Sequence, residues 1–307
     1  MLKIITTGRL GKDFAAALDK SSEDFEIKYV DELTSGDIEW ADCLAAFPVS
    51  NDIDISGIGW IHSFGAGVEG FLQRDDFDST TILTRTVGNL GFKMGEFCLC
   101  HILNFYQNTL NVYENKKQKK WESSYPESVE GKTVLILGSG EMAKGIASLL
   151  TKLRMKVIGV NTSGNKIHDI FSGCVKFDEV KSIANSVSCI INTLPLTDKT
   201  HGLLNEKFFT LFQNALFINV GRGQSVATDD LINAIDADNI AYAVLDVFET
   251  EPLPVSSSLW DHPDIYISPH QAAVTDVEDI VESFLEAYRF VKEKRMNYLF
   301  VDVEKSY

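Results

Sequence analysis

Short apolar runs alternate with helical patterns along almost the whole chain. An apolar run of about 4–8 residues between turn residues is typical of a buried strand, whereas apolar residues at i, i+3 and i+4 are typical of an amphipathic helix. The alternation predicts parallel sheets whose strands are connected by helices. The expected strands cover residues 3–7, 43–47, 60–64 and 81–84, and then 133–137, 156–160, 187–192, 215–220, 241–245 and 265–268.

Two longer helical patterns divide this series of strands. An amphipathic segment covers residues 91–120, and the polar stretch 121–130, which contains Pro126, is expected to be a linker. An acidic amphipathic helix is expected over residues 276–294. This order predicts two α/β domains joined by a long helix, and ligands of such open sheets bind beyond the carboxyl ends of the strands.

Composition narrows the class of protein. Apolar residues make up 45% and charged residues 23% of the 307-residue chain, as in soluble globular proteins, and no stretch reaches the ~20 apolar residues of a membrane span. The N-terminus runs directly into a strand-like segment without a signal peptide, so a cytoplasmic location is expected. The net charge of -16 argues against nucleic acid and anionic membranes as partners. The five cysteines lack metal-binding spacing, which predicts buried, reduced thiols and no metal site.

The segment 131–150 has the parts of a dinucleotide-binding turn. A buried strand is followed by Gly138, Gly140 and Ala143, and an apolar helix then begins at about Met142. The first glycine permits a tight turn, the second lets the backbone approach a pyrophosphate, and the helix N-terminus supplies N–H donors. The alternative is a tight turn of an α/β fold that binds no ligand.

The end of the next strand bears on the choice of cofactor. An acid at this position binds the ribose 2′-hydroxyl of NAD, but here Asn161 is followed by Thr162, Ser163 and, further on, Lys166. None of these groups repels a 2′-phosphate, and their hydroxyl, amide and ammonium groups are donors. We therefore expect NADP(H) to be preferred, with NAD(H) as the alternative.

Three further strand ends carry groups that fit one reaction. Arg222 follows strand 215–220, Glu251 follows strand 241–245, and His270 follows strand 265–268. A guanidinium binds a carboxylate through two parallel hydrogen bonds, an imidazole transfers one proton near neutral pH, and an adjacent carboxylate orients that imidazole. Singly, each has an ordinary structural explanation, but together with a hydride donor they fit the reduction of a 2-keto acid.

At this point the chain resembles the D-isomer-specific 2-hydroxyacid dehydrogenases, in the short form typified by glyoxylate/hydroxypyruvate reductases. The glycine turn contributes to the resemblance, and Arg222, Glu251 and His270 match the catalytic arginine, glutamate and histidine of the family. The other matching motifs, in the order found in the family, are residues 64–69, 192–197, 200–203, 219–223, 245–254 and 268–270.

The resemblance implies a fold and an assembly. It implies an α/β protein of two Rossmann-like or flavodoxin-like domains with parallel sheets and an active site in the interdomain cleft. Residues 1–95 plus 275–307 correspond to the substrate-binding domain, and residues 96–274 correspond to the dinucleotide-binding Rossmann domain. Family members are typically homodimers joined through the cofactor domain and the long helix.

The resemblance also assigns binding residues. Backbone N–H groups of Ala66 and Gly67, together with Arg222, are implied to bind the substrate carboxylate. Glu249 matches no functional position, and Arg154 replaces a glycine that often ends the helix before the second strand. The expected cofactor contacts are Gly138, Gly140, Glu141, Met142, Asn161, Thr162, Ser163, Leu194, Pro195, Thr200, Val220, Arg222 and Asp246.

The leading hypothesis is an oxidoreductase that transfers a hydride between NADP(H) and a small 2-keto acid, with His270 as proton donor. The alternatives are an NAD-dependent dehydrogenase of D-lactate or 3-phosphoglycerate type, and a nucleotide-sensing protein without turnover. The scarcity of cations along residues 65–69 disfavours a phosphorylated substrate. The sequence leaves the keto acid open, and its selectivity is expected to come from Phe47, Trp60, Arg85 and Trp260.

Overall fold

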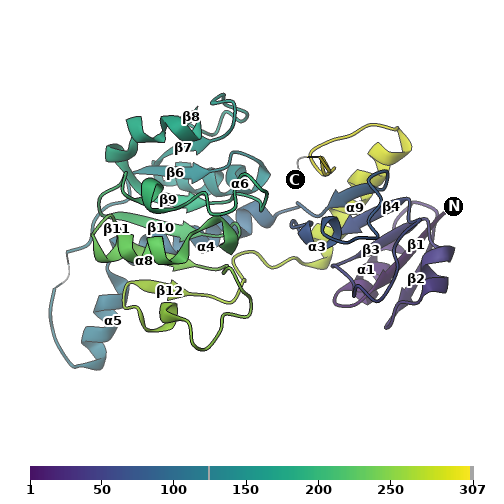
Figure 1. Cartoon of the computed structure of the whole chain (residues 1–307), viewed down its shortest axis with the longest axis horizontal. Coiled ribbons are helices and arrows are strands. Elements are labelled where there is room, and N and C mark those ends of the chain that lie inside the picture. Colours follow the sequence, from purple (N-terminus) through teal and green to yellow (C-terminus); the bar gives the residue numbers. More distant parts are fainter. Residues whose placement is uncertain (124, 305–307) are drawn as a thin grey trace. The chain divides into compact units, whose positions relative to one another are not determined.

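The computed structural model describes residues 1–123 and 125–304 and divides the chain into two compact units (Figure 1). Unit 1 comprises Met1–Leu90 and Val274–Tyr307, and unit 2 comprises Gly91–Ala273. Each unit contains one sheet, and the paired strands of the described residues run parallel throughout both sheets. The predicted α/β architecture with two parallel sheets is confirmed.

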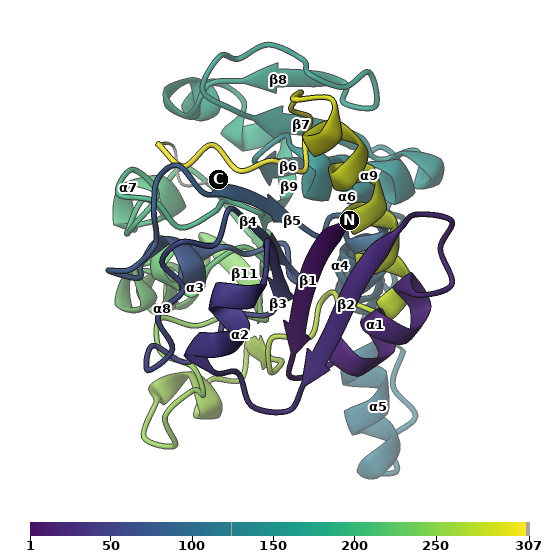
Figure 2. The same ribbon diagram turned by 90° about the vertical axis from the view of Figure 1, so that its right-hand side faces the viewer.

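The sheet of unit 1 has the order β2-β1-β3-β4-β5 within the described residues (Figure 2). Successive side chains of its strands point to opposite faces, and both faces are covered, so the inner strands are buried along most of their length. Its strands are β1 (Leu2–Thr7), β2 (Phe25–Val30), β3 (Cys43–Ala46), β4 (Trp60–Ser63) and β5 (Ile82–Arg85), and its helices are α1 (Gly11–Leu18), α2 (Ser35–Trp40), α3 (Glu69–Leu72) and α9 (Val277–Lys292).

Helices α1 and α9 pack together on one face of this sheet. Phe14 of α1 makes an edge contact with Phe284 of α9, and the ring of Trp60 stacks on Phe284 at a centroid distance of 4.8 Å. Trp60 is therefore a core residue, 3% exposed, and its predicted place in a substrate cleft is wrong. On the opposite face, Ile38 of α2 and Phe71 of α3 belong to a second apolar cluster.

The sheet of unit 2 has the order β12-β11-β10-β9-β6-β7-β8 in the described chain. This order reverses direction at the neighbouring strands β6 and β9, which is the switch point of a doubly wound fold. The strands are β6 (Thr133–Leu137), β7 (Lys156–Val160), β8 (Gly173–Val175), β9 (Val187–Asn192), β10 (Ala215–Asn219), β11 (Ile240–Leu245) and β12 (Ile265–Ile267). The helices are α4 (Leu90–Tyr106), α5 (Thr109–Lys117), α6 (Glu141–Leu150), α7 (Glu206–Phe209), α8 (Thr228–Asp236) and the 3-10 turns η1 (Thr151–Leu153), η2 (Phe177–Ser182), η3 (Ala184–Ser186), η4 (Gly223–Ser225) and η5 (Ser258–Asp261).

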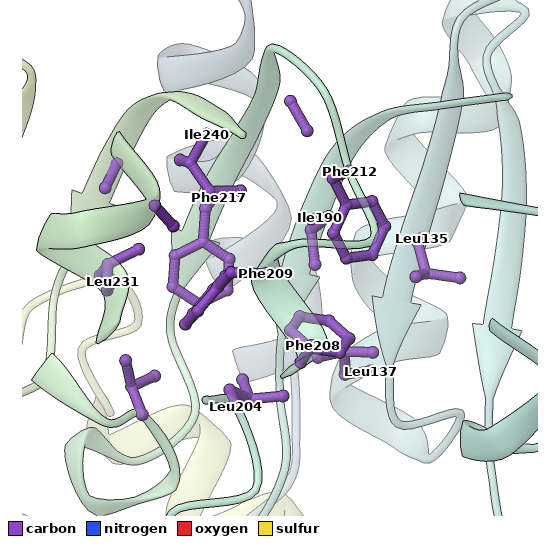
Figure 3. Packing of buried hydrophobic residues seen from close by; sticks show 14 of the residues in the cluster. Leu135, Leu137, Ile190, Leu204, Phe208, Phe209, Phe212, Phe217, Leu231 and Ile240 are labelled. Carbon is purple, nitrogen blue, oxygen red and sulfur yellow. The ribbon is translucent and has the colours of Figure 1, made fainter. Parts of the chain in front are cut away.

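Aromatic rings fill much of one face of this second sheet. Phe208, Phe209 and Phe212 project from α7 and the turn after it toward the sheet strands (Figure 3). The ring of Phe209 meets Phe217 of β10 edge-on at 5.3 Å between centroids. Each fully buried side chain of this size contributes about 2–3 kcal/mol, so the core fixes the strand ends that carry the site.

The structure differs from the sequence prediction at several elements. The strands β2 and β8 were not expected, and the single helix predicted for residues 91–120 is interrupted between α4 and α5, where Asn108 adopts a left-handed conformation. Arg154 takes the left-handed conformation, φ 59°, that a glycine would adopt, so the turn before β7 keeps its usual form. The prediction of buried cysteines is wrong for Cys100, which is exposed.

Within the described residues, no helix has the length and apolar character that a membrane-spanning helix requires.

Candidate active site

The carboxyl ends of the parallel strands of unit 2 lie along one edge of its sheet. The register pairs Leu137 of β6 with Val160 of β7 and with Asn192 of β9. Asn192 pairs with Asn219 of β10, which pairs with Leu245 of β11, and Leu245 pairs with Ile267 of β12. The segments after these strands therefore lie close together. They contain every predicted cofactor residue and the three predicted catalytic residues.

The glycine turn between β6 and α6 leaves room for a pyrophosphate. Gly138 has φ 106°, and a Cβ atom there would lie 2.5 Å from Oγ1 of Thr193, so a side chain is excluded. Gly140 is the N-cap of α6 without a side-chain cap, and a Cβ atom there would meet no heavy atom within 4 Å. Open space in front of uncapped helix N–H groups fits a dinucleotide phosphate.

The first residue of α6 carries a negative charge into this region. The carboxylate of Glu141 accepts a hydrogen bond from Nζ of Lys144 at 2.9 Å, and its other oxygen lies 3.4 Å from Nε2 of His168. The side chain is thus held by two basic residues. The backbone N–H groups of Glu141 and Met142 belong to the first turn and have no acceptor inside the helix.

The loop after β7 is organised by Asn161. Its Oδ1 accepts hydrogen bonds from Ser163 and from the backbone of Gly164, and its Nδ2 donates to Oγ of Ser139 and to the carbonyl of Asn165, both at 2.9 Å. Both amide N–H donors are therefore engaged within the protein. Asn161 shapes the loop and joins it to the glycine turn.

Buried polar side chains connect the central strand ends. Nδ2 of Asn192 donates to Oδ1 of Asn219 at 2.9 Å and to Oγ of Ser225 at 2.8 Å. These residues were not predicted, although paired asparagines at neighbouring strand ends were a visible signal. They hold the segments that begin at Leu194 and Val220, of which Val220 is buried.

A hydrogen-bonded turn closes the segment after β9. Oγ1 of Thr200 donates to the carbonyl of Pro195 at 2.6 Å and accepts from the N–H of Thr197 at 2.8 Å. The N–H of Leu194 donates to Oδ1 of Asn192 at 3.1 Å. Three predicted cofactor residues, Leu194, Pro195 and Thr200, thus lie in one ordered loop.

The structure brings Glu251 and His270 into direct contact. Nδ1 of His270 lies 2.8 Å from Oε2 of Glu251, and the other carboxylate oxygen accepts the N–H of Phe248 at 2.9 Å. His270 has a left-handed backbone with φ 51°, a conformation that is uncommon outside glycine and that accumulates at functional sites. With Nδ1–H donated to the carboxylate, Nε2 is the ring atom available for proton transfer.

Asp246 fixes the loop that carries His270. Its carboxylate is 1% exposed and accepts hydrogen bonds from Oγ of Ser268, from the N–H of Gln271 and from the N–H of Ala272, at 2.7, 2.8 and 2.9 Å. The N–H of His270 also donates to the carbonyl of Asp246. A carboxylate offers about four acceptor positions, so about one is left for the implied cofactor contact.

Arg222 follows β10, the neighbour of β11. Its Nη1 donates to the carbonyl of Gly221 at 2.7 Å. The next residue, Gly223, approaches the loop after β11 so closely that a Cβ atom would lie 1.9 Å from the carbonyl carbon of Phe248. The turn that carries Arg222 and the loop that carries Glu251 are therefore in main-chain contact.

Glu249 caps helix α8. Its Oε1 accepts hydrogen bonds from Oγ1 of Thr228 at 3.0 Å and from the N–H of the same residue at 3.4 Å. The side chain is exposed, and its contacts stabilise the first turn of the helix. Of the acids in residues 246–251, Glu251 contacts the histidine, Asp246 holds the histidine loop and Glu249 has a structural contact.

In unit 1 the turn after β4 presents backbone donors. Oγ of Ser63 donates to the carbonyl of Gly67 and accepts the N–H of Gly65, which closes the turn. Within residues 1–123 and 125–304, the N–H groups of Ala66 and Gly67 have no hydrogen-bond acceptor. Both residues are half-buried, and two adjacent free N–H groups are suited to bind a carboxylate.

Comparison with known proteins identifies the family to which the chain belongs. A family model described as D-isomer specific 2-hydroxyacid dehydrogenase, NAD binding domain, matches residues 99–272. The chain therefore belongs to the D-isomer specific 2-hydroxyacid dehydrogenase family, and the resemblance seen in the sequence is confirmed. It is an NAD(P)-dependent 2-hydroxyacid dehydrogenase, with a nicotinamide cofactor and a small hydroxy acid as substrate.

Individual relatives agree with this assignment. Glyoxylate/hydroxypyruvate reductase A of Serratia proteamaculans is 31% identical over 224 residues, which cover 70% of this chain and 71% of that protein. A family protein from Aeromonas salmonicida, 27% identical, matches the structure with a TM-score of 0.86 over 98% of this chain and 99% of that one. A D-isomer specific 2-hydroxyacid dehydrogenase from Xanthobacter autotrophicus, in complex with NADPH and MES, is 24% identical and has the same fold, with a TM-score of 0.90 over 100% of this chain and 99% of that one.

Proposed function

We propose that this enzyme reduces a small 2-keto acid such as glyoxylate or hydroxypyruvate with NADPH. The observation that carries the proposal is the contact of His270 with Glu251, whose strands β12 and β11 end on the same sheet edge as the glycine turn after β6. Unit 2 is the dinucleotide-binding domain in this proposal, and unit 1 is the substrate-binding domain. The name of the Serratia proteamaculans relative supports the choice of keto acids.

His270 is the proposed proton donor. The bound nicotinamide supplies the hydride that the keto carbon accepts. Nε2 of His270 protonates the oxygen on which negative charge develops, and Glu251 holds the ring through Nδ1 and stabilises the imidazolium form. In the reverse direction the same nitrogen removes the hydroxyl proton.

Substrate orientation is assigned to Arg222, Ala66 and Gly67. A guanidinium binds a carboxylate and an adjacent carbonyl oxygen through parallel N–H groups, and it stabilises charge that develops on that oxygen. The free N–H groups of Ala66 and Gly67 bind the substrate carboxylate. These donors offset the general repulsion of an anion by a chain with a net charge of -16.

The preference for NADPH rests on the loop after β7. Because the amide of Asn161 and the hydroxyl of Ser163 both donate hydrogen bonds within the loop, Thr162 and Lys166 are the proposed donors to a 2′-phosphate. One contact favours the NAD-dependent alternative: Oε2 of Glu179 lies 3.6 Å from the position of a Cβ atom on Gly164, close enough to the loop to accept a ribose hydroxyl.

The test is the oxidation of NADPH and of NADH by the purified enzyme with glyoxylate, hydroxypyruvate and pyruvate. The expected result is turnover of at least one keto acid with a higher kcat/KM for NADPH. A higher kcat/KM for NADH refutes the cofactor preference, and Glu179→Gln then identifies the acid responsible. Cofactor binding without turnover of any 2-keto or 2-hydroxy acid refutes the proposed reaction.

We also infer that the enzyme is a cytoplasmic homodimer. Helix α5 projects from the rest of unit 2 in Figures 1 and 2, and in the described chain none of its side chains is buried. Its Leu110, Val112 and Tyr113 and the nearby Trp121 and Tyr125 are exposed apolar residues, which a second copy would cover. Sedimentation velocity tests this: Val112→Asp is expected to weaken the dimer, and a monomeric wild type contradicts it.

The five free thiols support a reducing compartment.

A further inference from the structure

The turn between β1 and α1 holds an arginine next to the proposed substrate loop. Arg9 lies between Gly8 and Leu10, both in left-handed conformations with φ 68° and φ 67°. A left-handed leucine at a helix N-cap is unfavourable, and residues held in such conformations concentrate at functional sites. This turn follows the carboxyl end of β1, on the same sheet edge as Ala66 and Gly67.

The guanidinium of Arg9 reaches the neighbouring strand end. Its Cζ atom lies 5.4 Å from the centroid of the Phe47 ring, directly after β3. The same ring approaches the substrate loop, since its Cε1 atom lies 3.6 Å from the position of a Cβ atom on Gly65. One phenyl ring thus separates an exposed cation from the turn with the free N–H groups. The scarcity of cations along residues 65–69 of the sequence is offset by Arg9, which comes from another strand end.

The start of α1 provides further donors beside Arg9. The helix has no side-chain cap, and within the described residues the N–H groups of Lys12 and Asp13 have no acceptor. The hydroxyl of Thr6 is fully buried without a hydrogen-bond partner, and it lies 3.0 Å from the position of a Cβ atom on Gly11, the first residue of the helix. Unpaired buried hydroxyls are costly, so this hydroxyl is an unsatisfied polar group directly beneath the first residue of α1.

We propose that Arg9 and the start of α1 bind a second anionic group of the substrate, and that the preferred substrates are short 2-keto acids with a carboxylate or phosphate at the far end. The proposal rests on the proposed reduction of 2-keto acids. Ala66 and Gly67 bind the carboxylate next to the keto group, and Phe47 supports the chain between the two anionic ends. Lys12 adds positive charge to the turn, and Asp13 opposes it in part.

The experiment compares substrates in pairs whose members differ by one terminal anionic group. 2-Oxoglutarate is compared with 2-oxovalerate, and phosphohydroxypyruvate with hydroxypyruvate, and the readout is the ratio of kcat/KM for the doubly charged member to that for the singly charged one. In the wild type this ratio is expected to exceed one for at least one pair. If Arg9→Gln lowers this ratio only for the first pair, the preferred substrate is a dicarboxylate. If it lowers the ratio only for the second pair, the preferred substrate is phosphorylated.

Arg9→Gln is expected to lower the ratio about tenfold, because a charge-assisted hydrogen bond is lost. Arg9→Lys keeps the charge but not the planar group that stacks on Phe47 and forms two parallel hydrogen bonds. Its kcat/KM ratio is expected to lie between those of the wild type and Arg9→Gln. Lys20→Gln, at the other end of α1, removes the same charge from an exposed position and is the matched control.

The outcomes separate this proposal from the proposed reaction. If the wild type reduces singly charged keto acids and Arg9→Gln leaves both ratios equal to those of Lys20→Gln, the subsite is refuted and the reaction stands. If the wild type reduces no 2-keto acid, the reaction fails and the subsite fails with it.

Discussion

Nδ1 of His270 and Oε2 of Glu251 lie 2.8 Å apart, although 19 positions separate the two residues in the chain. The loop after β11 delivers the acid and the loop after β12 delivers the imidazole, and these strands are neighbours in the sheet. Because the two strands end side by side, the side chains that follow them are close enough to form a hydrogen bond. The proposed proton transfer depends on this bond.

Replacing His270 by alanine tests the proton donor. We expect kcat to fall by about 10²–10⁴-fold, because general acid catalysis contributes on this scale. Cofactor affinity, measured by titration of nucleotide fluorescence, is expected to stay near that of the wild type, since the glycine turn is untouched. A variant with normal turnover would remove His270 from its role.

Glu251→Gln tests whether the acid acts through the histidine. Alone it is expected to lower kcat by at least about tenfold, because an amide does not orient the ring and stabilise its charge as a carboxylate does. In the His270→Ala background the same change is expected to cause no further loss, since residues that act as a unit are not additive. A further loss in the double variant means that Glu251 acts independently.

Arg222→Lys separates binding by a guanidinium from binding by any cation. We expect a higher KM for the keto acid and a lower kcat, with kcat/KM reduced by about 10–100-fold, because an ammonium group cannot form the two parallel hydrogen bonds. Steady-state kinetics across several keto acids provide the measurement. A change in kcat alone is inconsistent with binding of the substrate carboxylate by this residue.

The open space at Gly140 predicts a variant that folds and binds its cofactor weakly. Gly140→Ala meets no neighbouring atom, so the variant is expected to fold, and because alanine is a poorer N-cap than glycine the free energy of unfolding is expected to fall by no more than about 1 kcal/mol. The added methyl group occupies the path of the pyrophosphate, so the Kd of NADPH is expected to rise at least about tenfold. Gly173→Ala, in β8 and equally free of neighbours, is the control. An unchanged Kd would argue against a phosphate at this turn.

Because His62 is buried, we expect the free energy of unfolding to fall at acidic pH. Burial lowers the pKa of this histidine to about 3, and its Nδ1 lies 2.8 Å from Oγ1 of Thr84. The folded state therefore keeps the ring neutral while the unfolded chain takes up a proton below pH 6.5, so this contribution is present above 6.5 and is lost as the pH falls toward 3. Its slope is about 1.4 kcal/mol per pH unit below 6.5.

Urea unfolding between about pH 7.5 and 5.5 measures this slope. His62→Gln is expected to flatten it, whereas His201→Gln, at an exposed position, is expected to leave it unchanged. Equal slopes in the two variants would show that protonation of His62 does not limit stability.

Much of the fold follows from periodicity, because apolar runs and helical repeats record burial directly. Strand β2 was missed although Phe25, Ile27 and Tyr29 alternate with polar residues, since its edge position leaves it only half-buried. The three-residue strand β8 is too short to leave a pattern. The break at Asn108 depends on a single left-handed residue, which asparagine adopts more readily than most.

The residues of the candidate site could be proposed from the sequence, but their contacts could not. Strand-end chemistry pointed to Glu251 and His270, but only the register of β11 and β12 brings them within hydrogen-bond distance. Asn161 illustrates the opposite case, since a sequence does not reveal that both amide donors are used within the loop. Arg9 was not identified because its neighbour Phe47 is 38 positions away in the sequence (9 against 47).

Gly223 has a consequence for how this enzyme diversifies. Its α-carbon touches the main chain at Phe248, so the spacing between the arginine and the acid is set by two rigid peptide surfaces. In the proposed reaction, insertions or bulkier residues in either turn are expected to move both groups at once and to lower the turnover of every substrate. New substrate preferences therefore have to evolve elsewhere, and the loops that follow β1 and β3, where Arg9 and Phe47 lie, can change without disturbing that spacing.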